Sequence, residues 1–370
     1  MINRISIQNY RSIRDLELEL DGINIIFGPN GCGKSNIYKA LHLLSASANG
    51  QVSPSISEEG GLENAMWSGS RTHGTSHRIT IACDTDEFEY EMQLGFPKLL
   101  PYPTQFQLDT VFKEENIWLS GYQRRASARI LQRKNQAAFL IDVNGEKQTF
   151  TESIYENESI FGQLGEPHRF PEVSQVREQM RSWRFYHDFD LSRHSALRKP
   201  AIGYRSPVLA SDAHNLAAAF QTIVEIGAVE VLEQILDKAF PDCRFYVENQ
   251  RSHFELMMQR EGLKRALHAY EMSEGTLRFL CLSVALLSPR PPRFIALNEP
   301  ENSLHPEMLP ALASLIVEAA QYSQIWLTSH SPRLAELIGS AQNFRLYQLA
   351  NQQGDRKSTR LNSVTWPYLV

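Results

Sequence analysis

The sequence predicts an α/β fold with a mixed sheet, in which antiparallel strands come first and an α+β lobe is inserted in the middle. Residues 2–8 and 16–20 alternate apolar and polar side chains, which is typical of an antiparallel strand pair with one buried face. In the last third, apolar segments at 294–297 and 325–328 alternate with helical segments. Because strands that alternate with helices form βαβ units, this part predicts a mostly parallel sheet.

The expected domain organisation follows from a change of character near residue 99. Three prolines between residues 97 and 103 precede irregular, strand-like segments, and regular helical periodicity returns after residue 210. We therefore expect three segments: 1–98 as the N-terminal half of a domain, 99–210 as an inserted lobe, and 211–370 as the C-terminal half. The sequence contains no long heptad run, so we expect no coiled-coil arm.

Composition favours a globular protein outside the membrane. The 370 residues are 42% hydrophobic, which is enough for a sizeable core. The 37 Lys and Arg against 42 Asp and Glu give a net charge of −5, so contact with nucleic acid would need a local basic patch. The four cysteines lack disulfide or metal-ligand spacing, and no segment resembles a signal peptide or membrane span. We expect a cytoplasmic protein with no membrane partner.

A glycine-rich motif follows the short apolar strand expected at residues 23–27. It reads Gly-Pro-Asn-Gly-Cys-Gly-Lys-Ser at 28–35, and a helical pattern begins directly after it. Such a loop binds nucleotide phosphates, because its backbone N–H groups and the helix N-terminus face the anion. We expect Lys34 to neutralise the β- and γ-phosphates of ATP and the Ser35 hydroxyl to ligate Mg²⁺. The residues expected at ATP here are Asn30, Gly31, Cys32, Gly33, Lys34, Ser35 and Asn36.

The apolar strand at 294–297 ends in Asn298 and Glu299. A magnesium nucleotide site needs a carboxylate at such a strand end, and Glu299 is suited to act as the general base that polarises the attacking water. The position before this glutamate usually holds aspartate. Asn298 offers an amide oxygen to a magnesium-bound water but no negative charge, so we expect weak magnesium affinity or slow turnover.

Two further features accompany this strand in chain order. Ser273 and Gly275 begin the preceding helix, where Ser273 is a good N-cap and Gly275 lets the backbone approach a phosphate. The next apolar strand is followed by His330, which is placed to form a hydrogen bond with the γ-phosphate. Most of the chain separates Lys34 from Glu299. Such a wide gap is typical of ATP-binding-cassette heads rather than hexameric ring ATPases.

Together these motifs resemble the RecF/SMC-like branch of ATP-binding-cassette (ABC) ATPases, and more narrowly the bacterial RecF-like proteins grouped as AAA-type predicted ATPases. The resemblance covers both ends of the chain, about half its length, and is loose in the middle. It implies the fold of an ABC-type P-loop NTPase head. The strings that carry it are Asn9-Tyr10-Arg11-Ser12-Ile13, residues 28–35, Ser273-Glu274-Gly275-Thr276, Asn298-Glu299-Pro300-Glu301 with Ser303-Leu304-His305-Pro306, and Thr328-Ser329-His330.

The resemblance also implies how the site is assembled. Two heads are expected to form a homodimer on ATP binding, with the phosphate loop, Glu299 and His330 of one subunit facing Ser273 and Gly275 of the other. The cofactors implied are ATP and Mg²⁺. The further site residues that it implies are Arg11, near the nucleotide, and Gln93, as a magnesium ligand.

A basic segment in the expected inserted lobe makes double-stranded DNA a candidate partner. Residues 120–135 carry five basic side chains and no acidic one, and residues 177–205 add seven basic side chains with interleaved aromatics. This composition fits either a phosphate-backbone track or a solvated, salt-bridged surface. The candidate DNA-binding residues are Arg124, Arg125, Arg129, Arg133 and Lys134.

The sequence leaves two functions open. The first is an ATP-driven DNA clamp used in repair or phage defence, and the second is a nucleotide-dependent switch that regulates a partner protein without touching DNA. A transporter ATPase ranks third, because transporter heads are shorter and lack the middle lobe. We expect no nuclease activity, because the forty residues after His330 are too few for the nuclease domain of OLD-type relatives.

Overall fold

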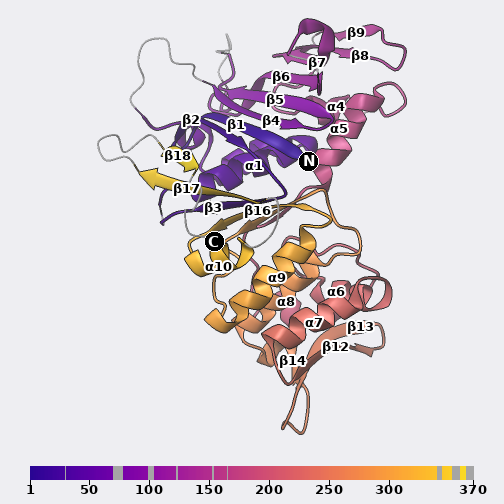
Figure 1. Ribbon diagram of the computed structural model, residues 1–370. Coiled ribbons are helices and arrows are strands. Elements are labelled where there is room, and N and C mark those ends of the chain that lie inside the picture. Colours follow the sequence, from indigo (N-terminus) through magenta and orange to yellow (C-terminus); the bar gives the residue numbers. More distant parts are fainter. Residues whose placement is uncertain are drawn as a thin grey trace. The chain divides into compact units, whose positions relative to one another are not determined.

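The chain forms two compact units, each built from more than one segment of the sequence. Figure 1 colours the chain from its N-terminus to its C-terminus. Unit 1 consists of Met1–Asp21, Gly28–Trp183 and Tyr347–Val370, and unit 2 of Gly22–Phe27 and Arg184–Leu346. The computed structural model describes residues 1–29, 31–69, 78–98, 104–121, 124–151, 154–164, 166–339, 344–351 and 359–363.

Unit 1 is built on an antiparallel sheet that has eight strands within the described residues, in the order β2-β1-β4-β5-β6-β7-β8-β9 (Figure 1). The expected N-terminal strand pair is confirmed, with Ile7 opposite Leu16 and both side chains buried. One face of each strand is apolar, so the period-two pattern fixes which face packs inward. The strands are β1 (Ile2–Tyr10), β2 (Ile13–Glu19), β4 (Ile79–Thr85), β5 (Phe88–Gly95), β6 (Val111–Leu119), β7 (Arg129–Lys134), β8 (Ala137–Ile141) and β9 (Lys147–Phe150).

The helices of unit 1 pack on this sheet and on one another. Helix α1 contacts β1 and β4, and the Ser45 hydroxyl on α1 donates a hydrogen bond of 3.0 Å to the Met180 carbonyl oxygen on α5. Ile37, Leu41 and Leu44 are buried on α1, as their spacing on one helical face predicts. The helices are α1 (Lys34–Ala48), α2 (Val52–Glu58), α3 (Leu62–Ala65), η1 (Ala126–Ala128), α4 (Ile160–Gln163) and α5 (Pro171–Ser182).

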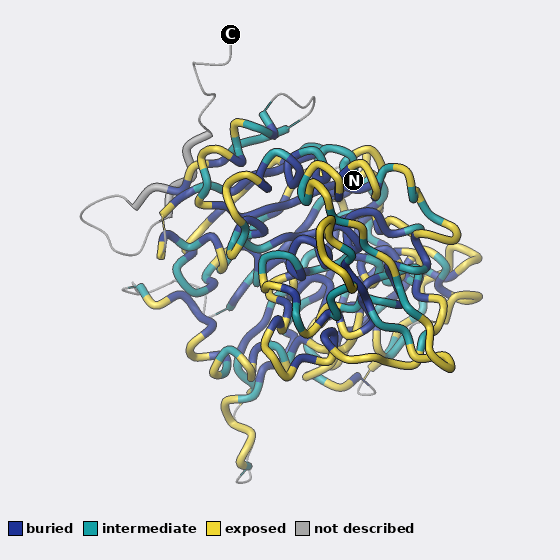
Figure 2. The backbone as a smooth tube through the Cα atoms, turned by 90° about the horizontal axis from the view of Figure 1, so that it is seen from below, coloured by how far each residue is buried: buried dark blue, intermediate teal, exposed yellow. Residues whose placement is uncertain are grey.

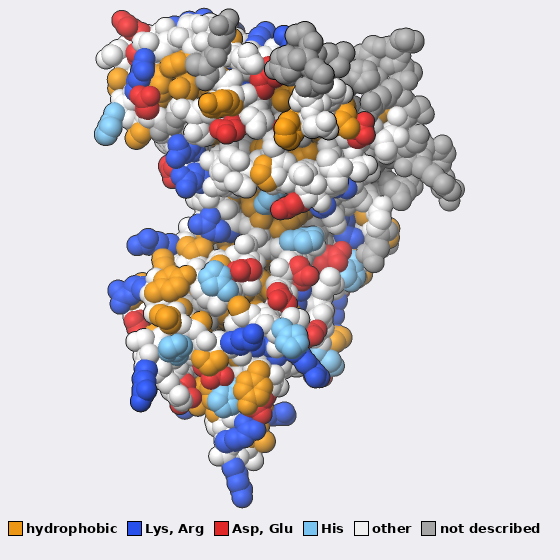
Figure 3. All heavy atoms as spheres, turned by 180° about the vertical axis from the view of Figure 1, so that it is seen from behind, with side chains coloured by type: hydrophobic (Ala, Val, Ile, Leu, Met, Phe, Trp, Pro, Cys, Tyr) orange, Lys and Arg blue, Asp and Glu red, His pale blue; other side chains and the backbone are white. Residues whose placement is uncertain are grey.

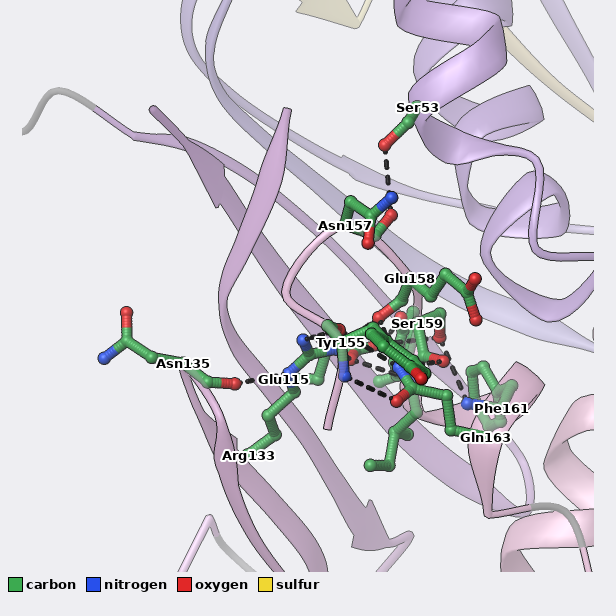
Figure 4. Close-up of polar contacts among 12 residues, drawn as sticks. Ser53, Glu115, Arg133, Asn135, Tyr155, Asn157, Glu158, Ser159, Phe161 and Gln163 are labelled. Atoms are coloured by element: carbon green, nitrogen blue, oxygen red, sulfur yellow. Dashed lines mark hydrogen bonds and ion pairs between the residues drawn. The ribbon is translucent and has the colours of Figure 1, made fainter. Parts of the chain in front are cut away.

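A buried ion pair joins β6 and β7 inside unit 1 (Figure 4). Arg133 Nη1 lies 2.8 Å from Glu115 Oε2, and neither side chain is exposed to solvent. The guanidinium also donates to the carbonyl oxygens of Asn135, Tyr155 and Glu158. The carboxylate accepts from three further donors, so this charged pair is fully hydrogen-bonded. Those donors are the Tyr90 hydroxyl, the Ser159 hydroxyl and the Ile160 N–H.

Unit 2 contains a parallel sheet in the order β10-β15-β16-β3. Strands β15 and β16 are apolar and buried on both faces, which confirms the parallel arrangement expected from their alternation with helices. In register, Asn298 on β15 lies opposite Thr328 on β16, and Ser329 lies opposite Phe27 on β3. The strands are β3 (Ile23–Phe27), β10 (Arg184–Tyr186), β15 (Phe294–Asn298) and β16 (Gln324–Ser329).

Helices and a second, antiparallel sheet complete unit 2. The apolar core gathers Leu297 and Leu327 from the parallel sheet with Phe279 and Leu312 from the helices. The helices are η2 (Ala196–Arg198), α6 (Leu216–Ile226), α7 (Val229–Ala239), η3 (Ala269–Glu271), α8 (Glu274–Leu286), η4 (Pro306–Met308), α9 (Leu309–Ala319) and α10 (Pro332–Ile338). The second sheet contains β11 (Ala201–Ile202), β12 (Cys243–Gln250), β13 (His253–Arg260) and β14 (Leu267–His268).

The two compact units do not coincide with the three expected segments. Strands β6 to β9 extend the N-terminal sheet, since β6 pairs with β5 and each later strand pairs with the one before it. Strand β10 joins the parallel sheet instead, so residues 99–210 are divided between the units. Strand β17 (Phe344–Asn351) pairs with β18 (Thr359–Ser363). In Figure 2, buried residues gather in the interior and exposed residues lie mainly along the outline. Within the described part of the chain, no helix has the length and apolarity needed to span a bilayer.

Candidate nucleotide site

The phosphate loop, residues 28–35, follows β3 directly, and α1 begins at Lys34. Gly31 and Gly33 have φ values of 79° and 103°, which side chains rarely tolerate, so the glycines of the motif allow the loop to turn tightly. Helix α1 has no side-chain cap at Gly33 and no acidic residue in its first turn. Its N-terminal N–H groups and its partial positive charge therefore suit an anion.

Lys34 lies along its own loop. Its Nζ donates hydrogen bonds to the carbonyl oxygens of Gly28 at 2.5 Å and Pro29 at 3.2 Å, and the residue is 4% exposed. A lysine on a phosphate loop is expected to be solvent-facing, whereas here the loop carbonyls hold the ammonium group against the backbone. The ammonium group therefore lies within the loop and does not extend into solvent.

Gly28 and Cys32 of the loop are packed against neighbouring atoms of unit 1. A Cβ atom at Gly28 would lie 2.8 Å from Cys32 Sγ and 3.1 Å from the Leu349 carbonyl oxygen, so only glycine fits there. Cys32 is buried, which fits a packing role. Asn36 donates a 2.7 Å hydrogen bond to the Ser12 hydroxyl, and Ser35 is exposed. Asn30 lies outside the described residues.

In unit 2, the ends of β15 and β16 bring four polar side chains together. We call Asn298, Glu299, Glu301 and His330 the carboxylate edge. The Asn298 amide oxygen accepts a 2.7 Å hydrogen bond from the Thr328 hydroxyl. The Glu299 backbone N–H donates to the Thr328 carbonyl oxygen at 3.0 Å, so the end of β16 fixes both residues of the motif.

Glu299 leaves the strand in an unusual conformation. Its φ is 46°, in the left-handed region, which turns the chain sharply after Asn298. Its Oε2 accepts a 2.8 Å hydrogen bond from the Asn302 amide, and its side chain is 21% exposed. The carboxylate is therefore oriented by one neighbour and still reaches solvent, as a general base must.

His330 follows β16 and faces two carboxylates. Its Nδ1 lies 3.8 Å from Glu299 Oε1 and 3.6 Å from Glu301 Oε1, both within ion-pair range. The sequence predicted Glu299 and His330 as site residues but assigned no role to Glu301. The one hint in the sequence was that Glu301 comes two residues after Glu299. The structure shows that the turn beginning at Glu299 brings the Glu301 side chain back toward His330.

The predicted signature residues begin α8. Ser273 Oγ accepts a 3.1 Å hydrogen bond from the Thr276 N–H, which confirms it as the N-cap. A Cβ at Gly275 would lie 2.6 Å from the Ser303 carbonyl oxygen, so glycine permits this helix to touch the turn that follows Glu299. Ahead of the helix, Arg265 binds Glu271 with two 2.7 Å contacts and holds the pKa of Glu271 at about 2.

One turn into α8, Arg278 connects the signature helix to the carboxylate edge. Its Nη2 donates a 3.0 Å hydrogen bond to the Glu299 carbonyl oxygen, and its Nη1 lies 3.4 Å from Asp188 Oδ1 at the end of β10. The Arg278 side chain is 7% exposed, whereas that of Asp188 is 77% exposed, so the guanidinium is buried but its acidic partner reaches water. Sequence reasoning missed Arg278, because a single arginine inside a helix carries no distinguishing pattern.

Two residues implied by family resemblance have partners within unit 1. Arg11 Nε donates a 2.9 Å hydrogen bond to Glu59 Oε2, and the Tyr10 hydroxyl donates to the same carboxylate. Gln93 lies in the middle of β5, where its Oε1 accepts from Arg78 and its Nε2 donates to Glu91. Nucleotide contact by Arg11 and magnesium ligation by Gln93 stay predictions.

Most members of the basic segment in unit 1 are paired with acids. Arg124 contacts Asp84, Glu89 and Glu91, and Lys134 lies 3.4 Å from Glu114 Oε1. On the face seen in Figure 3, basic side chains are interspersed with acidic ones.

Arg133 requires a correction. The sequence made it a DNA-binding candidate, but the ion pair with Glu115 buries it completely, so it has no access to a phosphate backbone. In 177–205, Arg198 is likewise buried and binds the carbonyl oxygens of Leu191, Ala269 and Met272. Basic composition in these segments therefore reflects internal structure as well as surface charge.

The residues present fit a magnesium nucleotide. The uncapped, acid-free N-terminus of α1 suits phosphate groups, and Lys34 adds a full positive charge. Mg²⁺ prefers oxygen ligands and shares them with substrate phosphates. The Ser35 hydroxyl in unit 1 is a ligand of that type, and so, in unit 2, are the Asn298 amide oxygen and the Glu299 carboxylate.

Sequence comparisons agree with this chemistry. A family model described as "AAA domain, putative AbiEii toxin, Type IV TA system" matches residues 23–336. The chain is 38% identical over 56 residues to an OLD nuclease of Thermus scotoductus, covering 15% of this chain and 10% of that protein. It is 50% identical over 42 residues to the DNA replication and repair protein RecF of Prosthecochloris aestuarii, covering 11% of each. The chain therefore matches only about a tenth of the length of these curated relatives.

Solved structures share the fold over nearly the whole chain. An SMC head bound to the C-winged helix domain of ScpA aligns with a TM-score of 0.59 at 14% identity, covering 98% of both chains. An SMC head with an extended coiled coil, bound to the C-terminal domain of ScpA from Pyrococcus furiosus, aligns with a TM-score of 0.54 at 13% identity, covering 98% of this chain and 96% of that one. The chain belongs to the AAA-domain family described as putative AbiEii toxin of a type IV TA system, and its fold is that of the RecF/SMC-like, ABC-type ATPases.

Proposed function

We propose that the protein binds ATP and hydrolyses it slowly at a site shared by two copies of the chain. The observation that carries this proposal is the order of the parallel sheet in unit 2. Glu299 and His330 follow directly after strands β15 and β16, and the phosphate loop follows directly after β3, the neighbour of β16. In a parallel sheet these carboxyl ends share one edge, where ligands bind in α/β folds.

In the proposed site, backbone N–H groups of residues 31–33, together with Lys34, hold the β- and γ-phosphates. The Ser35 hydroxyl and the Asn298 amide oxygen would hold Mg²⁺, which when bound neutralises part of the phosphate charge. Glu299 takes a proton from water as the water oxygen bonds to the γ-phosphorus. The bond to the β–γ bridging oxygen breaks, and its electron pair leaves with ADP. His330 donates a hydrogen bond to the γ-phosphate.

Slow turnover is attributed to the missing negative charge at position 298. We expect Asn298→Asp to raise the steady-state rate of phosphate release roughly tenfold and to lower the magnesium concentration that it needs, since 1.4 kcal/mol of added transition-state stabilisation is one factor of ten. The Thr328 hydroxyl would still have an acceptor. Asn298→Ala is the control, because it removes the amide without adding charge. An unchanged rate and magnesium dependence in Asn298→Asp would remove this residue from the metal's surroundings.

Dimerisation on ATP is supported by the position of Ser273. Its side chain is exposed at the start of α8, and Glu299 reaches solvent from the same unit. An isologous pairing would bring each Ser273 to the partner's γ-phosphate and complete two sites at once. ATP binding and dimerisation would then be linked by mass action.

Sedimentation velocity with saturating Mg²⁺ and ATP tests this arrangement. Glu299→Gln is expected to retain ATP and sediment as a dimer, because an amide cannot accept the proton from water. Ser273→Arg is expected to remain monomeric but still bind ATP, and Tyr322→Arg, which adds the same charge at another exposed position, should dimerise normally. A monomeric Glu299→Gln protein, or loss of ATP binding in Ser273→Arg, would contradict a shared site.

We propose DNA as the target of the ATP cycle, in repair or phage defence, because the curated proteins that match short segments of the chain include an OLD nuclease and a DNA replication and repair protein. A protein switch without DNA contact is the second candidate. The pairing of Arg124 with three carboxylates favours this second candidate, since it neutralises part of the basic segment.

Salt-dependent binding to duplex DNA separates the two candidates. We expect a triple variant, Arg124→Gln, Arg125→Gln and Arg129→Gln, to weaken duplex binding and to lower the salt slope by about one unit for each lost phosphate contact. Glutamine avoids adding like charges beside Asp84 and Glu89. A double variant of exposed basic residues elsewhere, Arg251→Gln and Lys264→Gln, is the control. If the wild-type protein binds no duplex at low salt, the protein-switch candidate replaces the DNA clamp.

A further inference from the structure

Strand β12 forms one edge of the antiparallel sheet in unit 2. All of its residues pair with β13, from Cys243 opposite Arg260 to Gln250 opposite His253. Among the described residues, no strand pairs with the other edge of β12. The strand contains neither proline nor lysine, and its pairing with β13 has no bulge, so it lacks features that usually protect an edge. Such an edge can accept a further strand through its backbone N–H and C=O groups.

The two faces of β12 differ in chemistry. Phe245 and Val247 lie on the face that packs against the apolar core, beside α6, and both are half-buried (Figure 1). Arg244, Tyr246 and Glu248 alternate with them and therefore lie on the opposite face. Arg244 is exposed, and Tyr246 is 43% exposed. This outer face thus carries a positive and a negative charge at equal distances from a central tyrosine.

Neither of these two charges is neutralised within the part of the chain that the structure describes. Arg244 and Glu248 take part in no ion pair there, and the Glu248 carboxylate accepts one long hydrogen bond, 3.3 Å from the Gln250 amide. Four residues of strand separate the two charges by about 13 Å, so they cannot reach each other. Glu248 also lines a cavity of about 520 Å³, which leaves room for an arginine from outside. A second strand with the same charges in reverse order would satisfy both.

We propose that β12 pairs antiparallel with β12 of a second copy of the chain, about a twofold axis at Tyr246. In this register Arg244 lies opposite Glu248 of the other copy, and the axis creates this contact twice. On the apolar face, Phe245 lies opposite Val247. Cross-strand pairs of both kinds stabilise a sheet. Moving the axis by one residue in either direction would set Arg244 opposite an uncharged side chain, so the charges select the register.

This contact is separate from the ATP-linked dimer. It needs no nucleotide, and it does not rest on the proposed ATPase function. An eight-residue strand pair is a small interface, and small interfaces bind weakly, so we expect a dissociation constant of roughly 100 µM. At about 1 µM protein the nucleotide-free chain is then monomeric, which allows the two contacts to be measured separately.

Cysteine cross-linking tests the register. Directly opposite Cβ atoms in an antiparallel pair lie about 4.5–5.5 Å apart, near the spacing that a disulfide needs. In a Cys243→Ser background, where the remaining cysteines are buried, we expect Tyr246→Cys to form a covalent dimer when nucleotide-free protein is oxidised. A non-reducing gel detects it.

Gln250→Cys in the same background is the control for cross-linking. Gln250 is also exposed, but in this register it lies eight residues, or about 26 Å, from its counterpart in the other copy. Absence of a covalent dimer in Tyr246→Cys, or equal cross-linking at both positions, would overturn the proposal.

Charge reversal tests the pairing of Arg244 with Glu248. Sedimentation equilibrium at about 200 µM protein without nucleotide, above the expected dissociation constant, measures the association. We expect Arg244→Glu to raise the dissociation constant at least roughly tenfold, because it sets like charges opposite each other. The double variant, Arg244→Glu with Glu248→Arg, restores opposite charges and should dimerise like the wild type.

Lys264→Glu is the matched control, because it makes the same charge change at an exposed position outside β12 and should leave the association unchanged. A wild-type protein that is monomeric at this concentration, or a double variant that does not recover, would overturn the proposal. Since both experiments omit nucleotide, a failure of ATP binding or hydrolysis would leave their results unchanged.

Discussion

Replacing Lys34 with alanine is expected to abolish measurable ATP binding while the protein remains folded. The ammonium group is held inside the phosphate loop by two carbonyl oxygens, and no other lysine lies in the loop. Loss of a charge-assisted contact with phosphate, worth about 3 kcal/mol, lowers affinity at least roughly 100-fold. Isothermal titration with a non-hydrolysable ATP analogue measures this loss.

A second lysine on the same helix provides the control for this experiment. Lys39 lies on α1 and pairs with Glu59 at 3.5 Å, outside residues 28–35. Lys39→Ala removes the same charge from the same helix and should keep wild-type affinity. Because Lys34 is buried, thermal melting of both variants is needed to show that the loop change leaves the fold intact. Equal affinities in Lys34→Ala and wild type would refute the phosphate-loop assignment.

Breaking the buried pair between Arg133 and Glu115 is expected to destabilise unit 1 strongly. Arg133→Met leaves the Glu115 carboxylate uncompensated inside the sheet and removes the donors to three backbone carbonyls. Removal of one partner of a buried ion pair typically costs about 3–5 kcal/mol. Equilibrium urea unfolding, followed by tryptophan fluorescence, measures the change in the free energy of unfolding.

An exposed arginine of the same unit separates the effect of burial from that of charge. Arg124→Met also removes an arginine that contacts carboxylates, but its side chain is 39% exposed, so the expected loss is at most about 1 kcal/mol. A double variant, Arg133→Met with Glu115→Met, should recover part of the stability, because no lone charge then stays buried. A loss of less than about 1 kcal/mol in Arg133→Met would show that water reaches Glu115.

Much of the architecture is encoded in local patterns. The sequence prediction matches the alternating burial of β1 and β2 and the burial of β15 and β16 on both faces. It also matches α8, which begins at the signature residues and precedes β15. These elements are readable because period and composition act within a few neighbouring residues. The glycine-rich loop was equally readable, since its spacing depends on backbone conformation and not on distant partners.

Contacts between residues that are far apart in the chain could not be predicted from the sequence. Composition marked Arg133 as part of a basic surface, whereas its partner Glu115 lies on another strand and its backbone acceptors lie further along the chain. Strand β10 is only three residues long, too short for a period to show, yet it joins the parallel sheet. Glu301 and Arg278 likewise gain their roles from contacts formed only after β15, β16 and α8 have packed.

The left-handed backbone conformation of Glu299 sets the thermal stability of the protein against its proposed ATP hydrolysis. A residue with a side chain in this conformation costs on the order of 1 kcal/mol relative to glycine, and Ser303, four positions later with φ 63°, adds a second such residue in the same turn. Glu299→Gly would relax the turn and remove the carboxylate together. A laboratory selection for heat resistance alone would therefore favour sequences that have lost their chemistry, and a screen for thermostable variants of this protein has to be coupled to ATP turnover.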